Sequence, residues 1–386
     1  MVAPYAPMGR CPEPHLGAAR KIEAIVSLLS RKDSEVVLVN TAHNPQVLQS
    51  FKTEISSIAG INVRELTLPC FSNRKLGKLF NLFHVGQAIE AVLNLGVPRL
   101  VWLYNGYAFE SLFARRLLKS LTCPVALEFE DWHFSRGRGL NPKPYLNWLA
   151  WRSMMPGISH AFAVNAALAS RLKPFTDRIS LLPGIVPTLL VSMARDALPF
   201  QGLAGEVTVG YFGGLSREKG ADLLLALAAG LPAGFRFEVT GGGELETRFV
   251  QLAGAQPERF RYHGKVGDQE LYSIMSRCDV ILNPHRSIAS MENGIFPFKV
   301  IEAIASGRLL ISTAVPGEGF EPVLQGVQFV EHSSNAFRRA LLSARAVYEE
   351  TCDNVAAGAR EANLRFGEAA FLARMEHILG HKVYGA

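Results

Sequence analysis

The sequence predicts two α/β domains in tandem, each built on a parallel sheet with helices on both faces. The chain has 386 residues, which is too long for one ordinary core and suits two domains of roughly 150–200 residues. Hydrophobic residues make up 48% of the chain and charged residues 19%, so substantial cores can form and a disordered chain is excluded. Short apolar runs alternate with helical stretches in both halves, which is the pattern of βαβ units.

In the first half, the expected strands are apolar or β-branched runs separated by longer helical stretches. We expect strands at 35–40, 62–68, 99–104 and 125–129, and helices at 16–31, 46–59, 76–95 and 108–121. The opening residues, MVAPYAP, have the pattern of the end of a strand that is either very short or begun further upstream.

A break with two prolines and two glycines at 187–206 predicts an interdomain linker, after which the alternation restarts. We expect strands at 207–212, 235–240, 260–263, 280–282 and 309–312, and helices at 221–229, 244–253, 268–276, 298–305 and 335–348. This gives an N-terminal domain at 1–198 and a C-terminal domain at 199–365. Ligands of doubly wound sheets bind at the carboxyl ends of the strands, so the expected site is a cleft that the two domains face.

The two halves differ in charge. Residues 1–200 hold 22 Lys+Arg and 13 Asp+Glu, a net of +9, whereas residues 201–386 hold 18 and 21, a net of −3. The basic half suggests an acidic partner such as anionic lipid, a phosphorylated substrate or nucleic acid, or else a solvated basic face. The five cysteines are odd in number and never form a CxxC pair, which favours reduced thiols in the cytosol and argues against a zinc ribbon. No secretory signal is visible, and the longest apolar run, 223–235, is too short to span a bilayer.

The segment GYFGGLSREKG, residues 210–220, has the parts of a pyrophosphate site. A strand ends in Gly213 and Gly214, and a helix begins just after Lys219. Glycines allow close backbone approach, a helix start offers unpaired N–H groups, and the lysine adds positive charge. The alternative is an ordinary tight turn with an exposed lysine. A dinucleotide fingerprint is absent, because Gly241–Gly243 is followed by Glu-Leu-Glu, so NAD or FAD binding is weakly supported.

The segment GIFPFKVIEAIASG, residues 294–307, predicts a helix with unusual charges near its start. Pro297 suits the first turn. Lys299 is electrostatically unfavourable there unless an anion occupies that helix end. Glu302 lies in an otherwise apolar helix and needs polar partners, for which ribose hydroxyls or a loop amide would serve.

Taken together, these segments resemble the family 4 (group 1) glycosyltransferases. Four motifs occur in the family's order: GGLSREKG, VTGGGELE, RYHGKVGDQELYSIMSRCDVILNPH and FPFKVIEAIASGRLLIS. The resemblance implies the GT-B fold, in which two Rossmann-like doubly wound domains face a cleft. It also implies that the helix at 366–386 crosses back to join the N-terminal, acceptor-side domain. The C-terminal domain, 199–365, would bind the nucleotide-sugar.

The resemblance also assigns roles to donor-side residues. Lys219 would neutralise the donor diphosphate and Glu302 would hold the ribose hydroxyls. The backbone at Lys265 and Val266 would contact the base, and the amides of 298–300 the distal phosphate. The full donor set is Gly213, Gly214, Arg217, Lys219, Gly241, Lys265, Val266, Glu292, Gly294, Phe298, Lys299, Val300 and Glu302.

Two positions depart from the family pattern. Gly294 stands where the family has the first glutamate of its pair, for which Glu292 or Asn293 could substitute. Gly214 stands where it has an arginine, whose charge Lys299 or Arg217 could restore.

On the acceptor side, the catalytic candidates are Glu130, Asp131 and His133, at the end of a predicted strand. Alternatively, Asp131 caps the following loop and His133 is incidental. Gly17 and Arg20 open the first helix where the family has its glycine-rich loop. No metal site is expected, because His377 and His381 lack a third ligand.

The function that the resemblance implies is retaining, metal-independent sugar transfer from a UDP-, GDP- or ADP-sugar to an acceptor hydroxyl. The acceptor would be a glycan, a lipid-linked molecule or a small molecule, in polysaccharide biosynthesis. The enzyme would be cytoplasmic, with peripheral contact at the inner face of an anionic membrane. The nucleotide-sugar is a co-substrate, so no cofactor is expected, nor is nucleic acid. The alternatives are a degenerate GT-B protein that binds nucleotide without catalysis, and a nucleotide-sugar epimerase. A glycan phosphorylase would need a pyridoxal-phosphate lysine that nothing in the sequence marks.

Overall fold

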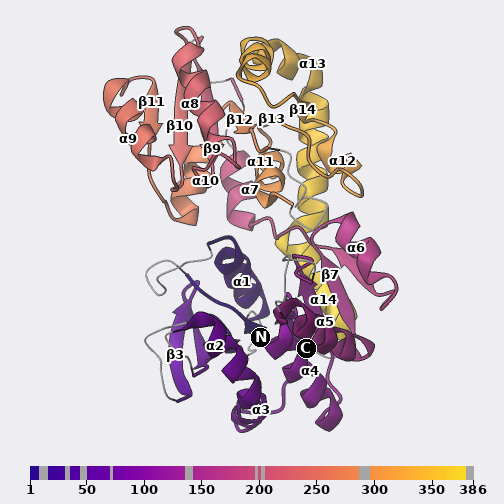
Figure 1. The fold of residues 1–386 in the computed structure, drawn as a ribbon. Helices are drawn as coiled ribbons and strands as arrows, with labels where there is room; N and C mark the ends of the chain where they lie inside the picture. Colours follow the sequence, from indigo (N-terminus) through magenta and orange to yellow (C-terminus); the bar gives the residue numbers. More distant parts are fainter. Residues whose placement is uncertain are drawn as a thin grey trace. The chain divides into compact units, whose positions relative to one another are not determined.

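The computed structural model describes residues 1–7, 16–30, 35–43, 50–69, 73–134, 142–195, 199–200, 205–286 and 296–379. Contacts within the chain divide the described residues into two compact units (Figure 1). Unit 1 contains residues 1–185 and 371–379, and unit 2 contains residues 186–286 and 296–370. Each unit is an α/β layer structure, as the sequence predicts.

Unit 1 is built on an eight-stranded sheet in the order β3-β4-β2-β1-β5-β6-β7-β8. All neighbours are parallel except β3, which runs antiparallel to β4 at the edge. The strands are β1 (Val2–Ala3), β2 (Val37–Asn40), β3 (Lys52–Ile58), β4 (Ile61–Thr67), β5 (Val101–Tyr104), β6 (Val125–Phe129), β7 (His160–Ala163) and β8 (Ile179–Leu181). The very short β1 lies in the middle of the sheet, where Val2 pairs with Val39 on one side and Leu103 on the other.

The helices of unit 1 pack on this sheet (Figure 1). They are α1 (Leu16–Leu29), α2 (Arg74–Phe80), α3 (Val85–Leu93), α4 (Ala108–Ser120), α5 (Lys143–Met154) and α6 (Ala166–Leu172), with short 3-10 helices η1 (Asn81–His84) and η2 (Met155–Gly157). Helix α14 (Glu368–Leu379) brings the C-terminal part of the described chain back to unit 1. Its Phe371 and Met375 are buried in a cluster with Trp102 and Phe162, so residues far apart in sequence share one core.

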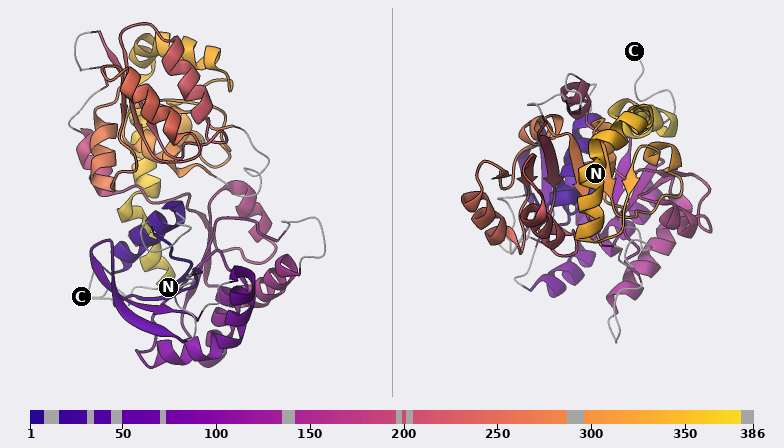
Figure 2. Two further views of the ribbon diagram at one scale, coloured as in Figure 1. Left: turned by 60° about the vertical axis from the view of Figure 1, so that its left-hand side comes forward. Right: turned by 90° about the horizontal axis from the view of Figure 1, so that it is seen from above.

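Unit 2 is built on a six-stranded, fully parallel sheet in the order β11-β10-β9-β12-β13-β14. The strands are β9 (Val207–Phe212), β10 (Phe235–Thr240), β11 (Phe260–Tyr262), β12 (Val280–Asn283), β13 (Leu309–Ser312) and β14 (Gln328–Phe329). Helices lie on both sides of the sheet (Figure 2). They are α7 (Thr188–Arg195), α8 (Ala221–Gly230), α9 (Glu246–Ala255), α10 (Asp268–Ser276), α11 (Phe298–Ala305), α12 (Glu321–Leu324) and α13 (Ser334–Phe366).

Four expectations about elements are wrong. The helix expected at 46–59 is instead strand β3 over 52–58, while 46–49 lie outside the described residues. Ala59 and Gly60 both have positive φ, so they form the two-residue turn of a hairpin with β4. The helix expected at 76–95 is divided by η1.

The remaining two errors concern unit 2. The linker expected at 187–206 contains helix α7, which packs against α10. The helix expected at 335–348 continues to residue 366, because nothing breaks the helical pattern before Gly367.

Candidate functional site

In unit 2, the turns after β9 and β10 lie in direct backbone contact. Leu215 N–H donates to the Gly242 carbonyl at 2.9 Å, and Leu245 N–H donates to the Leu215 carbonyl at 3.0 Å. Gly241 has φ +125°, and a Cβ there would overlap the Gly213 carbonyl oxygen. Glycine is therefore required for the two turns to approach this closely at the carboxyl ends of their strands.

Lys219 lies at the end of the β9–α8 turn, just before helix α8. The single O–H of buried Tyr211 is shared between two carbonyl oxygens, Gly214 at 2.8 Å and Lys219 at 3.2 Å, so it links both ends of the turn. Gly220, with φ +77°, passes so close to Pro284 that a Cβ would overlap the Pro284 carbonyl. The turn is thus held against the loop that follows β12.

That loop places His285 against Lys219. The Lys219 ammonium lies 2.8 Å from His285 Nε2 and 3.1 Å from the Glu218 carboxylate. Burial, followed by the neighbouring Lys219 and Lys299 ammonium groups, lowers the pKa of His285 to about 4, although the Arg286 carbonyl and Glu218 act in the opposite direction. His285 is therefore a neutral imidazole near neutral pH.

The first turn of helix α11 adjoins the same turn. Lys299 Nζ lies 4.8 Å from the centre of the Tyr211 ring, and the Lys299 side chain runs alongside Gly213. Its ammonium is buried and has no hydrogen-bond partner among the described residues. Burial and the Lys219 charge lower the pKa of Lys299 to about 7. A buried ammonium next to a second cation is costly, so this position favours an anion.

The first backbone N–H groups of α11 are available to bind a ligand. Pro297 precedes the helix and provides no side-chain cap, and Val300 N–H donates to the Pro297 carbonyl at 2.8 Å. The backbone N–H groups of Phe298 and Lys299 lie in the first turn, where an α-helix offers no carbonyl partner of its own. A helix start with positive side chains beside it is a suitable anion site.

The other donor-side candidates fall around this centre or outside it. Glu302 is buried one turn into α11, at 5% exposure. Lys265 and Val266 follow β11, and Lys265 lies next to Gly242. Arg217 has an exposed side chain, and its backbone amide donates to Glu244 at 2.9 Å. Of the two proposed substitutes for the charge missing at Gly214, the structure thus brings Lys299 close to the turn. Glu292, Asn293 and Gly294 lie outside the described residues.

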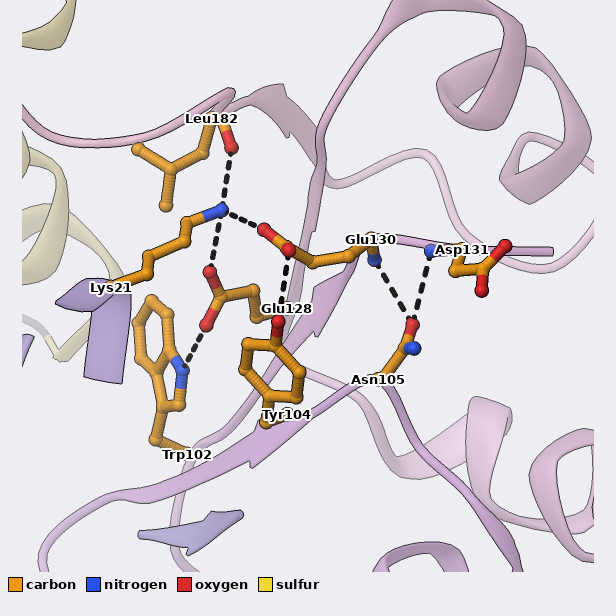
Figure 3. Close-up of polar contacts among 8 residues, drawn as sticks. All are labelled: Lys21, Trp102, Tyr104, Asn105, Glu128, Glu130, Asp131 and Leu182. Atoms are coloured by element: carbon orange, nitrogen blue, oxygen red, sulfur yellow. Dashed lines mark hydrogen bonds and ion pairs between the residues drawn. The ribbon is translucent and has the colours of Figure 1, made fainter. Parts of the chain in front are cut away.

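In unit 1, a buried network of charges lies at the carboxyl end of β6 (Figure 3). Lys21 of α1 pairs with Glu128 at 2.7 Å and with Glu130, and it donates to the Leu182 carbonyl at 3.0 Å. The indole N–H of Trp102 donates to Glu128 and the hydroxyl of Tyr104 donates to Glu130, each at 2.9 Å. Both Glu130 carboxylate oxygens therefore have partners within unit 1, and Glu130 stays a candidate whose contacts also hold Lys21 and Tyr104 in place.

Burial raises the pKa of Glu128, and the Lys21 charge opposes that shift. For Lys21, burial favours the neutral amine, but Glu128 and Glu130 outweigh it and the pKa rises. The two carboxylates thus favour the charged form of Lys21, whereas for Glu128 the effect of burial outweighs that of Lys21 and its pKa is raised.

Asp131 and His133 lie beside this network. Asn105, which has φ +62°, accepts hydrogen bonds from the amides of Glu130 and Asp131 at 3.1 Å each. The Asp131 carboxylate points away from Lys21 (Figure 3). His133 is buried, its Nδ1 lies 3.0 Å from the Asp131 carbonyl, and its ring packs on Tyr107 at 4.4 Å between centroids. Glu130, Asp131 and His133 thus lie together at the carboxyl end of β6 and remain the acceptor-side candidates.

Sequence reasoning missed Lys21, Glu128, Asn105 and His285. A signal for Lys21 existed, since it shares a helix face with Ile25 and Leu28 at i+4 and i+7, where a charge needs partners. The candidates Gly17 and Arg20 lie at the start of the same helix, where Gly17 is exposed and Arg20 half-buried. His285 stands two residues after β12, at the strand end where α/β sheets bind ligands.

A cavity of about 330 Å³ in unit 1 lies elsewhere, at the amino ends of β2 and β5, and its lining includes Val37, Val97, Pro98 and Leu100. The cavity and Glu130 therefore lie at opposite ends of the strands, since Glu130 follows the carboxyl end of β6. Among the described residues, no three His, Cys, Asp or Glu side chains are grouped so as to hold a metal ion. The described helices include none with the length and apolarity to cross a membrane.

In a comparison with protein families, the part of the chain that matches a family model lies in unit 2. Residues 206–345 match the family described as glycosyl transferases group 1. The match covers most of unit 2. It contains Lys219, His285 and Lys299, and the family resemblance expected from the sequence is confirmed. A comparison with curated proteins gave no match.

Solved structures resemble the chain over nearly its full length and confirm the GT-B fold. Sucrose-phosphate synthase from Thermosynechococcus elongatus has a TM-score of 0.68 at 15% identity, with 98% of this chain and 97% of that chain covered. A glycosyltransferase from Rickettsia africae has a TM-score of 0.66 at 14% identity, covering 100% and 98%. Anabaena HepE in complex with UDP has a TM-score of 0.64 at 15% identity, covering 98% and 99%.

Proposed function

We propose that this protein is a glycosyltransferase that moves a sugar from a nucleotide-sugar to an acceptor hydroxyl with retention of configuration. The observation that carries the proposal is the buried Lys299 ammonium beside Lys219 at the start of α11, which has no hydrogen-bond partner among the described residues. All three lie within the stretch that matches the group 1 glycosyltransferase family. An anionic diphosphate is a ligand that satisfies them together.

In this proposal, Lys219, Lys299 and the first amides of α11 bind the donor diphosphate. They stabilise the negative charge that develops as the nucleoside diphosphate leaves, which is electrostatic catalysis by groups already in place. This charge compensation involves no metal ion. Glu302 would hold the ribose hydroxyls, and the backbone at Lys265 and Val266 would contact the base.

Unit 1 would supply the acceptor side through Asp131 and His133, at the carboxyl end of β6. The acceptor would be a glycan, a lipid-linked molecule or a small molecule, in polysaccharide biosynthesis at the cytoplasmic face of a membrane. The basic composition of residues 1–200 supports an anionic membrane or acceptor as the partner.

The test is the release of nucleoside diphosphate from UDP-, GDP- and ADP-sugars in the presence and absence of acceptors. We expect acceptor-dependent release with one of these bases. Lys219→Ala and Lys299→Met should each lower the rate by about 100-fold or more, the usual effect of losing one group that stabilises transition-state charge. Arg338→Ala, which removes an exposed cation from α13, is the matched control and should leave the rate unchanged.

Other outcomes point to the alternatives. Nucleotide binding without turnover on any acceptor would indicate a degenerate binding protein. Interconversion of nucleotide-sugars without acceptor would indicate an epimerase. Normal turnover by both lysine variants would contradict the proposed donor site.

A further inference from the structure

His285 is fully buried and uses both ring nitrogens. Its Nδ1 lies 2.7 Å from the Arg286 carbonyl oxygen, and its Nε2 lies 2.8 Å from the Lys219 ammonium. A carbonyl oxygen can only accept, so Nδ1 carries the proton. Nε2 then has a lone pair that accepts from the ammonium.

The position of this ring is fixed from several sides. Thr313 Oγ1 donates to the His285 carbonyl at 2.5 Å, and Arg286 N–H donates to the Glu218 carbonyl at 3.0 Å. The Arg286 side chain pairs with Asp222 of helix α8 at 2.7 Å. The loop after β12 and the turn that carries Lys219 are thus held as one piece.

Among the described residues, the charged groups that face the ring come from two elements. They are Lys219 and Glu218 on the β9–α8 turn and Lys299 on α11, with the Arg286 carbonyl on the ring's own loop. Glu218 is exposed and competes for the same ammonium at 3.1 Å. A carboxylate that holds a lysine offsets its positive charge with a negative one. A neutral imidazole holds the lysine and offsets none of that charge.

We propose that His285 is a positioning residue that holds the Lys219 ammonium at the donor phosphate site without cancelling its charge. The inference rests on the proposed function, since it assumes that Lys219 contacts the donor diphosphate. It adds a reason for an imidazole rather than a carboxylate at this position. Protonation of Nε2 would remove the acceptor and add a third positive charge, which would displace Lys219.

The experiment measures affinity by calorimetry for a nucleoside diphosphate and for the matching nucleoside. UDP, GDP and ADP are tried, and the one that the wild-type protein binds is used. His285→Leu removes the acceptor and should weaken diphosphate binding about tenfold, while nucleoside binding stays unchanged. His285→Asn supplies a neutral acceptor and should restore most of that loss. His332→Gln changes an exposed histidine of the same unit and serves as the control.

A carboxylate at position 285 tests whether holding the Lys219 ammonium is enough or whether its positive charge must also stay uncompensated. His285→Asp can hold Lys219 but neutralises it, so it should bind the diphosphate about tenfold more weakly than His285→Asn at neutral pH. This comparison remains decisive if His285→Leu does not fold. Acid gives a further readout, since wild-type affinity should fall more steeply than that of His285→Asn as the pH approaches 4.

The outcomes distinguish this inference from the proposed function. If the wild-type protein binds none of the three nucleotides, the proposed function fails. If it binds one, and the Leu, Asn and Asp variants all bind the diphosphate as well as the wild type does, the role of His285 is refuted. A loss of nucleoside and diphosphate binding by the same factor would show a merely structural role and would also refute it.

Discussion

At the residue scale, the main feature of the candidate donor site is the buried ammonium of Lys299, which has no hydrogen-bond partner in the described part of the chain. Lys299 has a pKa lowered to about 7 by burial and by Lys219, well below the usual lysine value. A bound anion would remove this penalty and raise the pKa again. The ionisation of Lys299 is therefore coupled to ligand binding.

This coupling predicts proton uptake when a nucleotide binds. At about pH 8, Lys299 is mostly neutral in the free protein and should bind up to about one proton together with a nucleoside diphosphate. Calorimetry in two buffers of different ionisation enthalpy measures the uptake. Lys299→Met should abolish it, whereas proton uptake that is unchanged in this variant would show that Lys299 does not face the ligand.

The sign of the effect on stability follows from the same shift. The pKa of Lys299 is lower in the folded than in the unfolded chain, so the unfolded chain binds more protons between about pH 7 and 10. The contribution of this group to stability therefore rises with pH in that window in the free protein.

The Lys21 network of unit 1 gives a second prediction at this scale. Lys21→Met leaves Glu128 and Glu130 without their cation and should cost roughly 3–5 kcal/mol of unfolding free energy near neutral pH. Because burial favours the protonated form of Glu128, the loss should shrink as the pH falls. Urea unfolding at two pH values measures this. The exposed Lys173→Met is the control, and an equal effect of the two variants would contradict the network's importance.

At the element scale, the glycine turns determine how close the strand ends of unit 2 can come. Gly241→Ala should destabilise the domain by about 2 kcal/mol or more, since its positive φ and the nearby Gly213 carbonyl exclude a Cβ. Gly254→Ala in α9 meets open space and should stabilise by about 0.5–1 kcal/mol. Chemical denaturation of both variants checks the contrast, which would be lost if the turn were loosely packed.

Elements with a clear pattern could be predicted from sequence, and those that depend on one turn could not. Strands β6, β9, β10 and β13 and helices α10 and α11 have the expected bounds, because each is an apolar run or an amphipathic period between glycines or prolines. The hairpin of β3 and β4 was missed because Ala59 adopts a positive φ in its turn, and alanine does not indicate such a turn in a sequence.

The candidate site was predictable to the same degree. Lys219, Lys299 and the glycines follow from local motifs. The contact of His285 with Lys219 joins residues 66 positions apart and arises only when β12 lies beside β9. The contact of Glu130 with Lys21 could not be predicted either, because the two residues are 109 positions apart.

At the scale of the whole molecule, each unit has its own core, and the chain enters unit 1 twice. The buried clusters of unit 1 include Phe371 and Met375 of α14, while the large cluster of unit 2 draws on α8, α9 and α13. The domain ranges 1–198 and 199–365 remain a proposal. The contacts divide the described chain after residue 185 and return it to unit 1 at 371.

Because side chains of α14 are part of the core of unit 1, we expect a substitution in α14 to lower the stability of unit 1. Phe371→Ala should cost about 3–5 kcal/mol in the unfolding of unit 1, as expected for a buried aromatic side chain. Nucleotide affinity, a property of unit 2, should stay the same. Scanning calorimetry with and without nucleotide measures both, with the exposed Leu364→Ala as control. A loss of nucleotide binding with no change in unit 1 would contradict this division.

In the proposed donor site, the turn bearing Lys219 and the first turn of α11 together bind a diphosphate. The most direct measurement is a crystal structure of the protein with its nucleoside diphosphate. We predict phosphate oxygens within hydrogen-bond distance of both the Lys219 and the Lys299 ammonium groups. A nucleotide bound with its phosphates away from these two lysines would contradict this donor site.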